Sequence, residues 1–212
     1  MMKVLGVLAG QDVPIEVVVA WCRSADFVIA ADGAANRLID SGASPDLIVG
    51  DLDSLEPIHA STHARVKADL DQETTDCDKL LIYVQENLPD SDLSIVGIEG
   101  DRFDHVLASL HSIARISPNS RLILRDGVAW FVRLGQEVIA STKPDQTMSL
   151  IPITDCTGVE LTGVAWPPKT EISPLGATSI SNQATGDHVR AKIMTGMALL
   201  VLRADTSKPD WS

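Results

Sequence analysis

Acidic side chains gather in four short segments of this chain, and each segment follows or adjoins a run of apolar residues. The four segments are Ala31-Asp32-Gly33-Ala34-Ala35-Asn36, Pro45 to Leu55, Asp71 to Lys79, and Gly97 to His105. Oxygen ligands suit Mg²⁺, and a divalent cation relieves the repulsion between neighbouring carboxylates. Together the segments predict a Mg²⁺-dependent phosphoryl or pyrophosphoryl transfer site.

Within Pro45 to Leu55, Asp51 and Asp53 are two residues apart. In an extended chain such residues point the same way, so both carboxylates are expected on one side. The competing interpretation is a solvated loop with Asx-turns.

Thr75 is expected to cap a helix that carries Asp76 and Asp78 in its first turn, followed by Lys79. Residues three apart share a helix face, so one of these groups could hold a metal and the other a phosphate. Acids at a helix start are also favoured by the helix dipole alone, and that interpretation stays open.

The other two segments offer anion-binding features. Small residues after Asp32 leave helix N-terminal amides free for an anion, although Asp32 could equally be a structural cap. The guanidinium of Arg102 is well suited to a phosphate, and Asp104 is placed to orient Arg102 or His105. An ordinary helix start is the alternative here.

The first two-thirds of the chain alternates apolar runs with helical patterns, which is typical of an α/β fold: a mainly parallel sheet with helices on both faces. Expected strands are 3–9, 27–31, 47–49, 65–68, 93–97 and 121–125, and expected helices are 15–24, 34–41, 75–87 and 103–116. Because each strand is read as an uninterrupted apolar run, all six are expected to be buried on both faces. Ligands bind beyond the carboxyl ends of such strands, where the acidic segments fall.

After about Gly135 the helical period disappears, and short β-prone runs follow at 147–153, 159–161, 178–181, 188–194 and 197–202. This pattern predicts a small antiparallel sandwich or barrel, and we expect a β-sandwich domain. We therefore expect two domains, residues 1–135 and 136–212.

The net charge of the chain is −12, and residues 32–104 alone carry an excess of that size. No basic run is present, which argues against nucleic-acid binding. No apolar run approaches the length of a membrane helix, so no membrane partner is expected. Three widely spaced cysteines, Cys22, Cys77 and Cys156, favour a reducing, cytoplasmic location.

The ordered set D-G-A-A-N, P-D-L-I-V-G-D-L-D-S, D-Q-E-T-T-D-C-D-K and G-D-R-F-D-H resembles the thiamine pyrophosphokinase family, and Ser179-Ile180-Ser181-Asn182 resembles that family's S-x-S-N segment. The resemblance implies transfer of the pyrophosphoryl group of ATP to the hydroxyl of thiamine, giving thiamine diphosphate and AMP. It also implies a homodimer whose sites each lie between the α/β domain of one subunit and the β-sandwich of the other.

Carried over by position, the resemblance implies roles for three groups of residues. The Mg²⁺-associated acids are Asp51, Asp53 and Asp76; the positions around ATP are Asp32, Asn36, Gln72, Thr75, Lys79, Arg102, Asp104 and His105; Ser179, Ser181 and Asn182 face thiamine. Residues 1–135 would thus bind nucleotide and metal, and 136–212 would bind thiamine. The catalytic residues would be Asp51, Asp53, Asp76, Asp71 and Arg102. The candidates for the general base are Asp71 and Asp76.

One departure concerns the aromatic residue that some relatives place after S-x-S-N to stack on thiamine, since Gln183-Ala184-Thr185 follow here. Trp166 is the nearest aromatic by sequence, although taken by itself it is expected in the core. Two rival functions remain: a nucleotide-sugar transferase using Asp51-x-Asp53, and a non-enzymatic acidic metal-binding module.

Overall fold

The computed structural model describes residues 1–56, 64–69, 71, 73–176 and 179–211. The chain forms two compact units, one of Met1–Arg125 with Asp205–Ser212 and the other of Asp126–Ala204. None of the helices in these described residues combines the length and the apolar character needed to span a bilayer.

Among the described residues, the strands of the first unit pair in parallel throughout, in the order β6-β5-β1-β2-β3-β4. The strands are β1 (Lys3–Val7), β2 (Phe27–Ala31), β3 (Leu47–Gly50), β4 (Arg65–Ala68), β5 (Asp92–Val96) and β6 (Arg121–Leu124). The strand order reverses between β1 and β5, where crevices for ligands form in such sheets.

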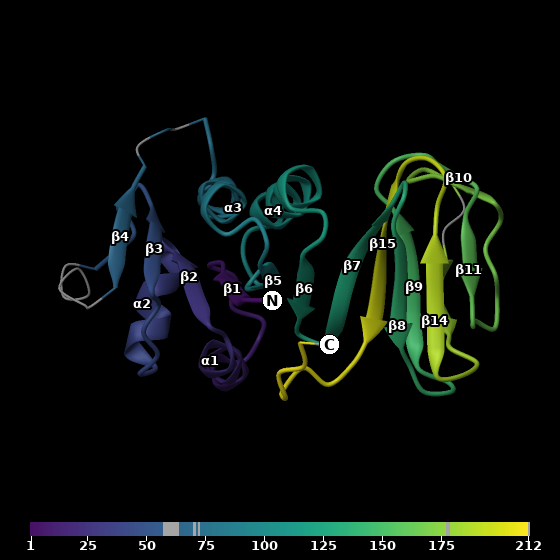
Figure 1. Ribbon diagram of the computed structural model, residues 1–212, viewed down its shortest axis with the longest axis horizontal. Helices are drawn as coiled ribbons and strands as arrows, with labels where there is room; N and C mark the ends of the chain where they lie inside the picture. Colours follow the sequence, from purple (N-terminus) through teal and green to yellow (C-terminus); the bar gives the residue numbers. More distant parts are fainter. Residues whose placement is uncertain (57–63, 70, 72, 177–178, 212) are drawn as a thin grey trace. The chain divides into compact units, whose positions relative to one another are not determined.

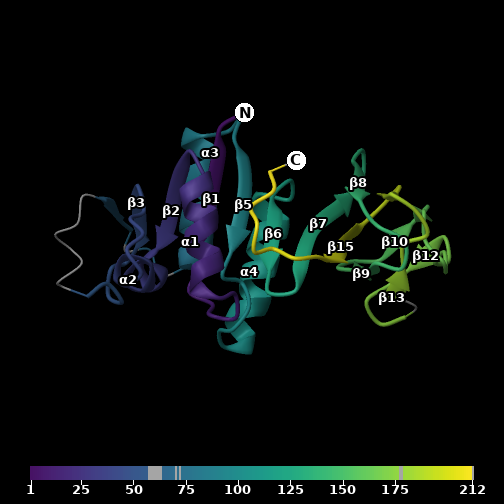
Figure 2. The ribbon, with the colours of Figure 1, turned by 90° about the horizontal axis from the view of Figure 1, so that it is seen from below.

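The helices that cover this sheet in the described part of the unit are α1 (Ile15–Ser24), α2 (Asp32–Asp40), α3 (Asp76–Asn87) and α4 (Phe103–Ile116). Figure 1 shows α1 and α2 on one face and α3 and α4 on the other. Figure 2, seen from below, shows α1 crossing the face formed by β1 and its neighbours. The predicted parallel sheet with helices on both faces is confirmed.

Strand β4 differs from the expected buried strand. All four of its residues are exposed, because β4 is the edge of the sheet and pairs only with β3. Its sequence is Arg-Val-Lys-Ala, and the two cations lie over aromatic rings: Arg65 is 5.5 Å from the Phe27 ring and Lys67 is 5.2 Å from the Tyr83 ring. Charged side chains on an edge strand oppose pairing with other chains. The expectation of burial was therefore wrong for β4.

The second unit is an antiparallel β-sandwich, as predicted. One sheet has the order β13-β9-β15-β7, another has the order β11-β14-β8, and β10 pairs with β12. The strands are β7 (Gly127–Arg133), β8 (Glu137–Ser141), β9 (Thr147–Pro152), β10 (Cys156–Thr157), β11 (Glu160–Thr162), β12 (Glu171–Ile172), β13 (Ser179–Gln183), β14 (His188–Lys192) and β15 (Met197–Arg203). Alternate residues of both larger sheets, such as Leu150 and Ala191, meet in one apolar core.

Strands β7 and β8 and the two-residue strands β10 and β12 were missed in the sequence. The run Val-Ala-Trp-Phe-Val in β7 resembles one more buried strand of the parallel sheet, but β7 pairs antiparallel with β15 over its whole length. The change from parallel to antiparallel pairing occurs at β7 because its partner is β15, which lies more than 60 residues further along the chain. The compact units consequently divide after Arg125, whereas the texture of the sequence changes near Gly135.

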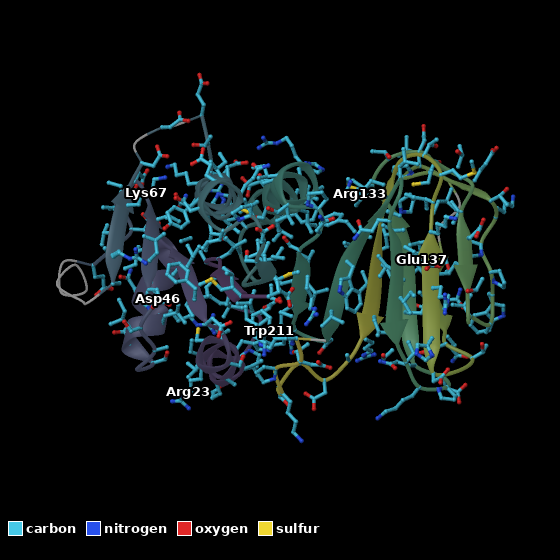
Figure 3. The ribbon with its side chains drawn as sticks, in the orientation of Figure 1. Arg23, Asp46, Lys67, Arg133, Glu137 and Trp211 are labelled. Atoms are coloured by element: carbon cyan, nitrogen blue, oxygen red, sulfur yellow. The ribbon has the colours of Figure 1, made fainter. Side chains whose placement is uncertain are left out.

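After β15 the chain returns to the first unit. The indole Nε1 of Trp21 donates to the Thr206 carbonyl at 2.9 Å, and the Trp211 ring meets the Trp21 ring edge-on at 5.3 Å between centroids. Trp211 Nε1 also donates to Ser24 Oγ at 3.0 Å. Figure 3 shows Trp211 beside α1. Residues 205–211 therefore complete the packing of α1.

Candidate active site

A cavity of about 300 Å³ lies in the first unit, at the carboxyl ends of its central strands. It is lined by the ends of β1, β2 and β5, by the start of α3 and by one side of α4. Six of the predicted residues line it: Asp51, Asp71, Thr75, Asp76, Lys79 and His105. Each of the four acidic segments contributes to the lining, the first through Ala31, as expected from their positions after strands.

Three carboxylates form a cluster at this edge of the sheet. Asp32, Asp51 and Asp53 each offer an oxygen, and these oxygens lie within 4.8 Å of one another. Asp32 is buried and anchored: Oδ1 accepts from the Gly33 amide at 2.6 Å and Oδ2 from the Leu52 amide at 2.8 Å. Gly50 makes room for it, since a Cβ at that position would lie 2.6 Å from Asp32 Cγ.

The loop between Asp51 and Asp53 is not extended. Leu52 has a φ of 67°, a left-handed conformation that costs a non-glycine residue free energy and persists where surrounding contacts impose it. Asn36 of α2 fixes the next residues: its Nδ2 donates to Ser54 O at 2.7 Å and its Oδ1 accepts from the Glu56 amide at 3.0 Å. The two aspartates converge as predicted, but through a hydrogen-bonded turn.

The start of α3 is fixed by a capping box. Thr75 Oγ1 accepts from the Asp78 amide at 3.1 Å, while Asp78 Oδ2 accepts from the Thr75 amide at 3.0 Å. This confirms Thr75 as the N-cap. Asp78 also forms an ion pair with Arg115 of α4. Burial acts to raise the pKa of Asp78, but hydrogen bonds from Thr75 and Ser112 and the charge of Arg115 outweigh it and hold this pKa below its ordinary value.

Asp76 and Lys79 share a helix face, with Nζ 3.7 Å from a carboxylate oxygen of Asp76. Burial, followed by the charge and hydrogen bond of Asp32 and the charge of Asp51, raises the pKa of Asp76 to about 6, against the lowering effect of Lys79. Asp76 is therefore close to the carboxylate cluster, and it forms an ion pair with the buried Lys79. A cluster of carboxylate oxygens fits a hard divalent cation such as Mg²⁺.

The fourth segment pairs its own charges. The Arg102 guanidinium donates to Asp104 through Nε at 3.2 Å and through Nη2 at 2.6 Å, and both side chains are exposed. This pairing is one of the two orientations predicted for Asp104, and it raises the pKa of Arg102 further. His105 instead meets Asp101, with Nδ1 3.0 Å from Oδ2, and both residues line the cavity.

In the second unit, the S-x-S-N segment divides between the core and the surface. Ser179 and Asn182 are buried, whereas Ser181 is exposed and has a φ of 55° at a bulge in the pairing of β13 with β9. Asn182 Nδ2 donates to Ser179 Oγ at 2.9 Å and to Trp166 O at 2.6 Å. The Asn182 amide is thus engaged within the sandwich, and Trp166, expected in the core when taken by itself, is exposed.

The predicted residues consequently differ in where they lie. Around the cavity are the six residues named above, and Asp32 and Asp53 adjoin them through Asp51. Asn36 lies behind the loop that it holds, and Arg102 and Asp104 lie outside the cavity lining. The three S-x-S-N residues lie in the second unit, and Gln72 lies outside the described residues.

Some residues of the cavity wall were not predicted. Asp101 lies in the G-D-R-F-D-H motif but has no predicted role, although its spacing of four from His105 on a helix start is a recognisable signal. Ala108 and Ser109 line the cavity from α4, and no feature of their own sequence marks them.

Family comparisons agree with this division into two units. Residues 19–124 match the family described as thiamin pyrophosphokinase, catalytic domain, and residues 136–198 match thiamin pyrophosphokinase, vitamin B1 binding domain. The first match contains the acidic cluster and the start of α3, and the second contains the S-x-S-N segment.

Individual relatives carry the same family name. Thiamine pyrophosphokinase 1 of Oryza sativa subsp. japonica is 26% identical over 205 residues, which cover 85% of this chain and 70% of the rice protein. Thiamine pyrophosphokinase 1 of Arabidopsis thaliana is 31% identical over 144 residues, covering 56% of this chain and 53% of the Arabidopsis protein.

Solved structures share the fold. Thiamin pyrophosphokinase from Candida albicans superposes with a TM-score of 0.79 at 16% identity, covering 96% of this chain and 90% of that one. Thiamine pyrophosphokinase from Bacillus subtilis gives 0.78 at 23% identity, covering 96% and 100%. With both domain families matched in order, the rival functions are not favoured, and the chain belongs to the thiamine pyrophosphokinase family.

Proposed function

We propose that this protein transfers the pyrophosphoryl group of ATP to the hydroxyl of thiamine, giving thiamine diphosphate and AMP, in a Mg²⁺-dependent reaction. The observation that carries the proposal is the carboxylate group of Asp32, Asp51, Asp53 and Asp76 beside the buried Lys79, at the end of a parallel sheet in a chain of this family. A polyphosphate with its metal requires this combination of oxygen donors and one cation.

Asp51, Asp53 and Asp76 are proposed as the metal-holding residues, with Asp32 added to the set because its oxygen lies within the cluster. Bound there, Mg²⁺ would neutralise charge on the phosphates of ATP. Asp32 is already fixed by two main-chain amides, so it needs no reorganisation on binding. Asn36 supports the site from behind by holding the loop after Asp53.

The transfer is an in-line attack by the thiamine hydroxyl oxygen on the β-phosphorus. A new O–P bond forms there, and the bridging oxygen between the α- and β-phosphorus leaves with AMP. Lys79 and Arg102 offset charge on the transferring group, and for Arg102 this requires release from Asp104. Asp71 is proposed to accept the hydroxyl proton, because Asp76 is assigned to the metal. Thr75, Gln72, Asp104 and His105 are assigned to the surroundings of ATP. The contribution of the protein is mainly positioning and electrostatic stabilisation.

Thiamine is assigned to the second domain and nucleotide and metal to the first. We further propose a homodimer whose sites combine the first domain of one subunit with the second domain of its partner. A cytoplasmic location is proposed as well, supported by three cysteines that are free and not paired in disulfides.

The reaction is tested by incubating the protein with ATP, Mg²⁺ and thiamine and separating the products. AMP and thiamine diphosphate in equal amounts support the proposal. ADP with thiamine monophosphate would overturn the reaction type. Release of a nucleoside diphosphate from a nucleotide sugar supports the transferase rival, and cation binding without nucleotide binding supports the metal-binding module.

The metal assignment is tested with Asp53→Asn, which keeps the shape of the side chain and removes its charge. Turnover is expected to fall by roughly 100-fold or more, since metal ligands of this kind stabilise the charge of the transition state. Asp90→Asn, a change at an exposed turn, is the matched control and should keep parent activity. Activity of Asp53→Asn within threefold of the parent at saturating Mg²⁺ would make the assignment wrong.

Sharing of sites between subunits is tested by complementation. Asp53→Asn subunits are mixed with subunits carrying Ser181→Trp, which blocks the proposed thiamine side, and the mixture is allowed to exchange. If the sites are shared, mixed dimers regain one intact site and activity returns. Two inactive variants that stay inactive after proven exchange contradict sharing.

A further inference from the structure

The cavity of the first unit extends along the ends of four neighbouring strands. Its lining includes Asp51 after β3, Ala31 at the end of β2, Leu8 and Ala9 after β1, and Gly97 after β5. These strands are neighbours in the order β5-β1-β2-β3, so three spacings of about 4.8 Å, roughly 14 Å in all, separate β5 from β3. The carboxylate cluster that contains Asp51 lies toward β3, which leaves the β5 end for another part of an elongated ligand.

Two loops at the β5 end are held closely together. The loop after β1 bonds to the loop after β5, with the Gly10 amide donating to Gly97 O at 2.8 Å. Gly100 has a φ of 83°, and a Cβ at that position would lie only 2.4 Å from the Asp12 amide nitrogen. Asp101 follows Gly100 directly, so the main chain that carries the Asp101 carboxylate is fixed by this contact.

The cavity lining near β5 combines apolar surface with two polar side chains. Leu8, Ile98 and Ala108 line the cavity with apolar atoms, and Asp101 and His105 line it with a carboxylate and an imidazole. Ligand sites commonly combine apolar walls with a few polar groups that fix the orientation of the ligand. A flat heterocycle with polar atoms at its edge fits such a lining.

Asp101 and His105 form a hydrogen-bonded pair within this lining. His105 Nδ1 lies 3.0 Å from Asp101 Oδ2. An ionised carboxylate can only accept hydrogen bonds, so Nδ1 carries the hydrogen in this pair. In a neutral imidazole the other nitrogen, Nε2, is then an acceptor without a hydrogen. A neutral His105 held in this way can accept a hydrogen bond from a ligand but cannot donate one.

We propose that His105 Nε2 accepts a hydrogen bond from the exocyclic amine of adenine, and that Asp101 is the positioning residue that fixes the tautomer of His105. The inference rests on the proposed function, which assigns the phosphates and Mg²⁺ to the carboxylate cluster and thereby directs the base toward β5. In inosine triphosphate a carbonyl replaces the amine of ATP. Against Nε2 this carbonyl brings two acceptors together and leaves both without a hydrogen. The pair therefore determines specificity for a base that carries an amine at this position.

The proposal is tested by comparing kcat/KM of the full-length protein for ATP and for inosine triphosphate at saturating thiamine. The parent is expected to favour ATP by roughly tenfold or more, because a site that bonds to a substrate amine rejects an analogue without it. Asp101→Asn should abolish this preference, because its amide can donate to Nδ1 and allow the tautomer with a hydrogen on Nε2. Asp187→Asn is the matched control: it changes another exposed pair, with Nδ1 of His188 2.9 Å from Asp187 Oδ1, and should keep the parent preference.

A double variant separates positioning from direct contact. His105→Gln should also lose the preference for ATP, because a side-chain amide can donate as well as accept. If Asp101 acts through His105, the Asp101→Asn/His105→Gln variant has the same ratio of kcat/KM values as His105→Gln alone. A further change in the double variant shows a direct Asp101 contact with the base and overturns the positioning role. If Asp101→Asn lowers kcat/KM for both nucleotides by the same factor, its effect is structural and the inference is wrong.

Binding is measured separately by calorimetric titration with each nucleotide and Mg²⁺ in the absence of thiamine, which does not depend on turnover. The parent is expected to bind ATP roughly tenfold more tightly than inosine triphosphate, and Asp101→Asn should bind both equally. If the parent makes thiamine diphosphate equally well from both nucleotides, the inference is wrong and the proposed function stands. If the parent makes no product but binds ATP more tightly in a manner that depends on Asp101, the proposed function fails and the role of the pair stands.

Discussion

At the scale of single residues, the site depends on side chains whose neighbours leave space for them or fix them by hydrogen bonds. Asp32 occupies the space that a side chain at position 50 would fill, and its two oxygens are held by the amides of Gly33 and Leu52. The types and spacing of Asp51 and Asp53 were enough to predict that their carboxylates lie together. That Asp32 belongs to the carboxylate cluster was not predictable, because its position depends on the space left by Gly50 at the end of the neighbouring strand β3.

Gly50→Ala tests this packing. The new Cβ would meet Asp32 Cγ at 2.6 Å and Oδ2 at 2.8 Å, so the carboxylate must move away from its two amides. We expect the Mg²⁺ concentration for half-maximal activity to rise roughly tenfold, as for changes in groups that orient metal ligands. Gly186→Ala, where a Cβ meets nothing within 4 Å, should leave the Mg²⁺ dependence unchanged. An unaltered Mg²⁺ requirement in Gly50→Ala contradicts a metal role for Asp32.

The cysteines should be inert in the folded protein. Burial raises the pKa of Cys22 and Cys77 to about 12, and it also raises the pKa of Cys156. At pH 8 the thiolate of Cys22 is then scarcer than in a free cysteine by on the order of a thousandfold. Reaction with a chromogenic disulfide reagent is expected to be slow until guanidinium is added, when three thiols react. One thiol reacting at the free-cysteine rate without denaturant would contradict this.

At the scale of elements, the sequence predicted most of what positions the site. The helices at α1, α3 and α4 begin and end where their periodicity and caps indicated, because those signals are local. Strand β4 and strands β7 and β8 were misread or missed for a different reason. Whether Arg65–Ala68 is an edge, or whether β7 pairs with β15, is decided by distant segments. The hydrogen bonding of Asn182 could not be predicted either, because its partner Trp166 lies in another loop.

The capping box of α3 should be measurable as stability. Asp78→Ala removes the hydrogen bonds to Thr75 and the pair with Arg115, and we expect the free energy of unfolding to fall by about 1–2 kcal/mol. Urea denaturation measures the loss, with Asp90→Ala as the exposed control. A decrease no larger than that of the control means that the box does not stabilise α3.

The same comparison has a defined pH dependence. The pKa of Asp78 in the folded protein lies below its ordinary value of 3.8, so its stabilising effect is fully present above that pH. As pH falls through the folded-state pKa, the carboxylate is protonated and the effect disappears. The difference between parent and Asp78→Ala is therefore expected to be constant from pH 5 to 7, a range above that pKa, and to shrink below 3.8.

At the scale of the whole molecule, residues 205–211 join the end of the second unit back to the first. A chain ending at Ala204 leaves the buried Trp21 indole N–H without its carbonyl partner, which costs about 1–3 kcal/mol, and loses the aromatic pair, worth about 0.5–1.5 kcal/mol. In thermal unfolding, the melting temperature of the truncated chain should be lower than that of Trp211→Leu. The melting temperature of Trp211→Leu should in turn be lower than that of the parent. Equal melting temperatures for all three proteins would show that the segment contributes nothing.

This return of the chain also sets an order of events during synthesis. Domains fold from the N-terminus as they leave the ribosome, but the first unit here lacks one of its own parts until the whole β-sandwich has been translated. Until then, the indole N–H of Trp21 in the nascent α/β unit lacks its hydrogen-bond partner, and one side of α1 is uncovered. Its last contacts form only once Thr206 and Trp211 have emerged, so the part of the protein made first is the part finished last.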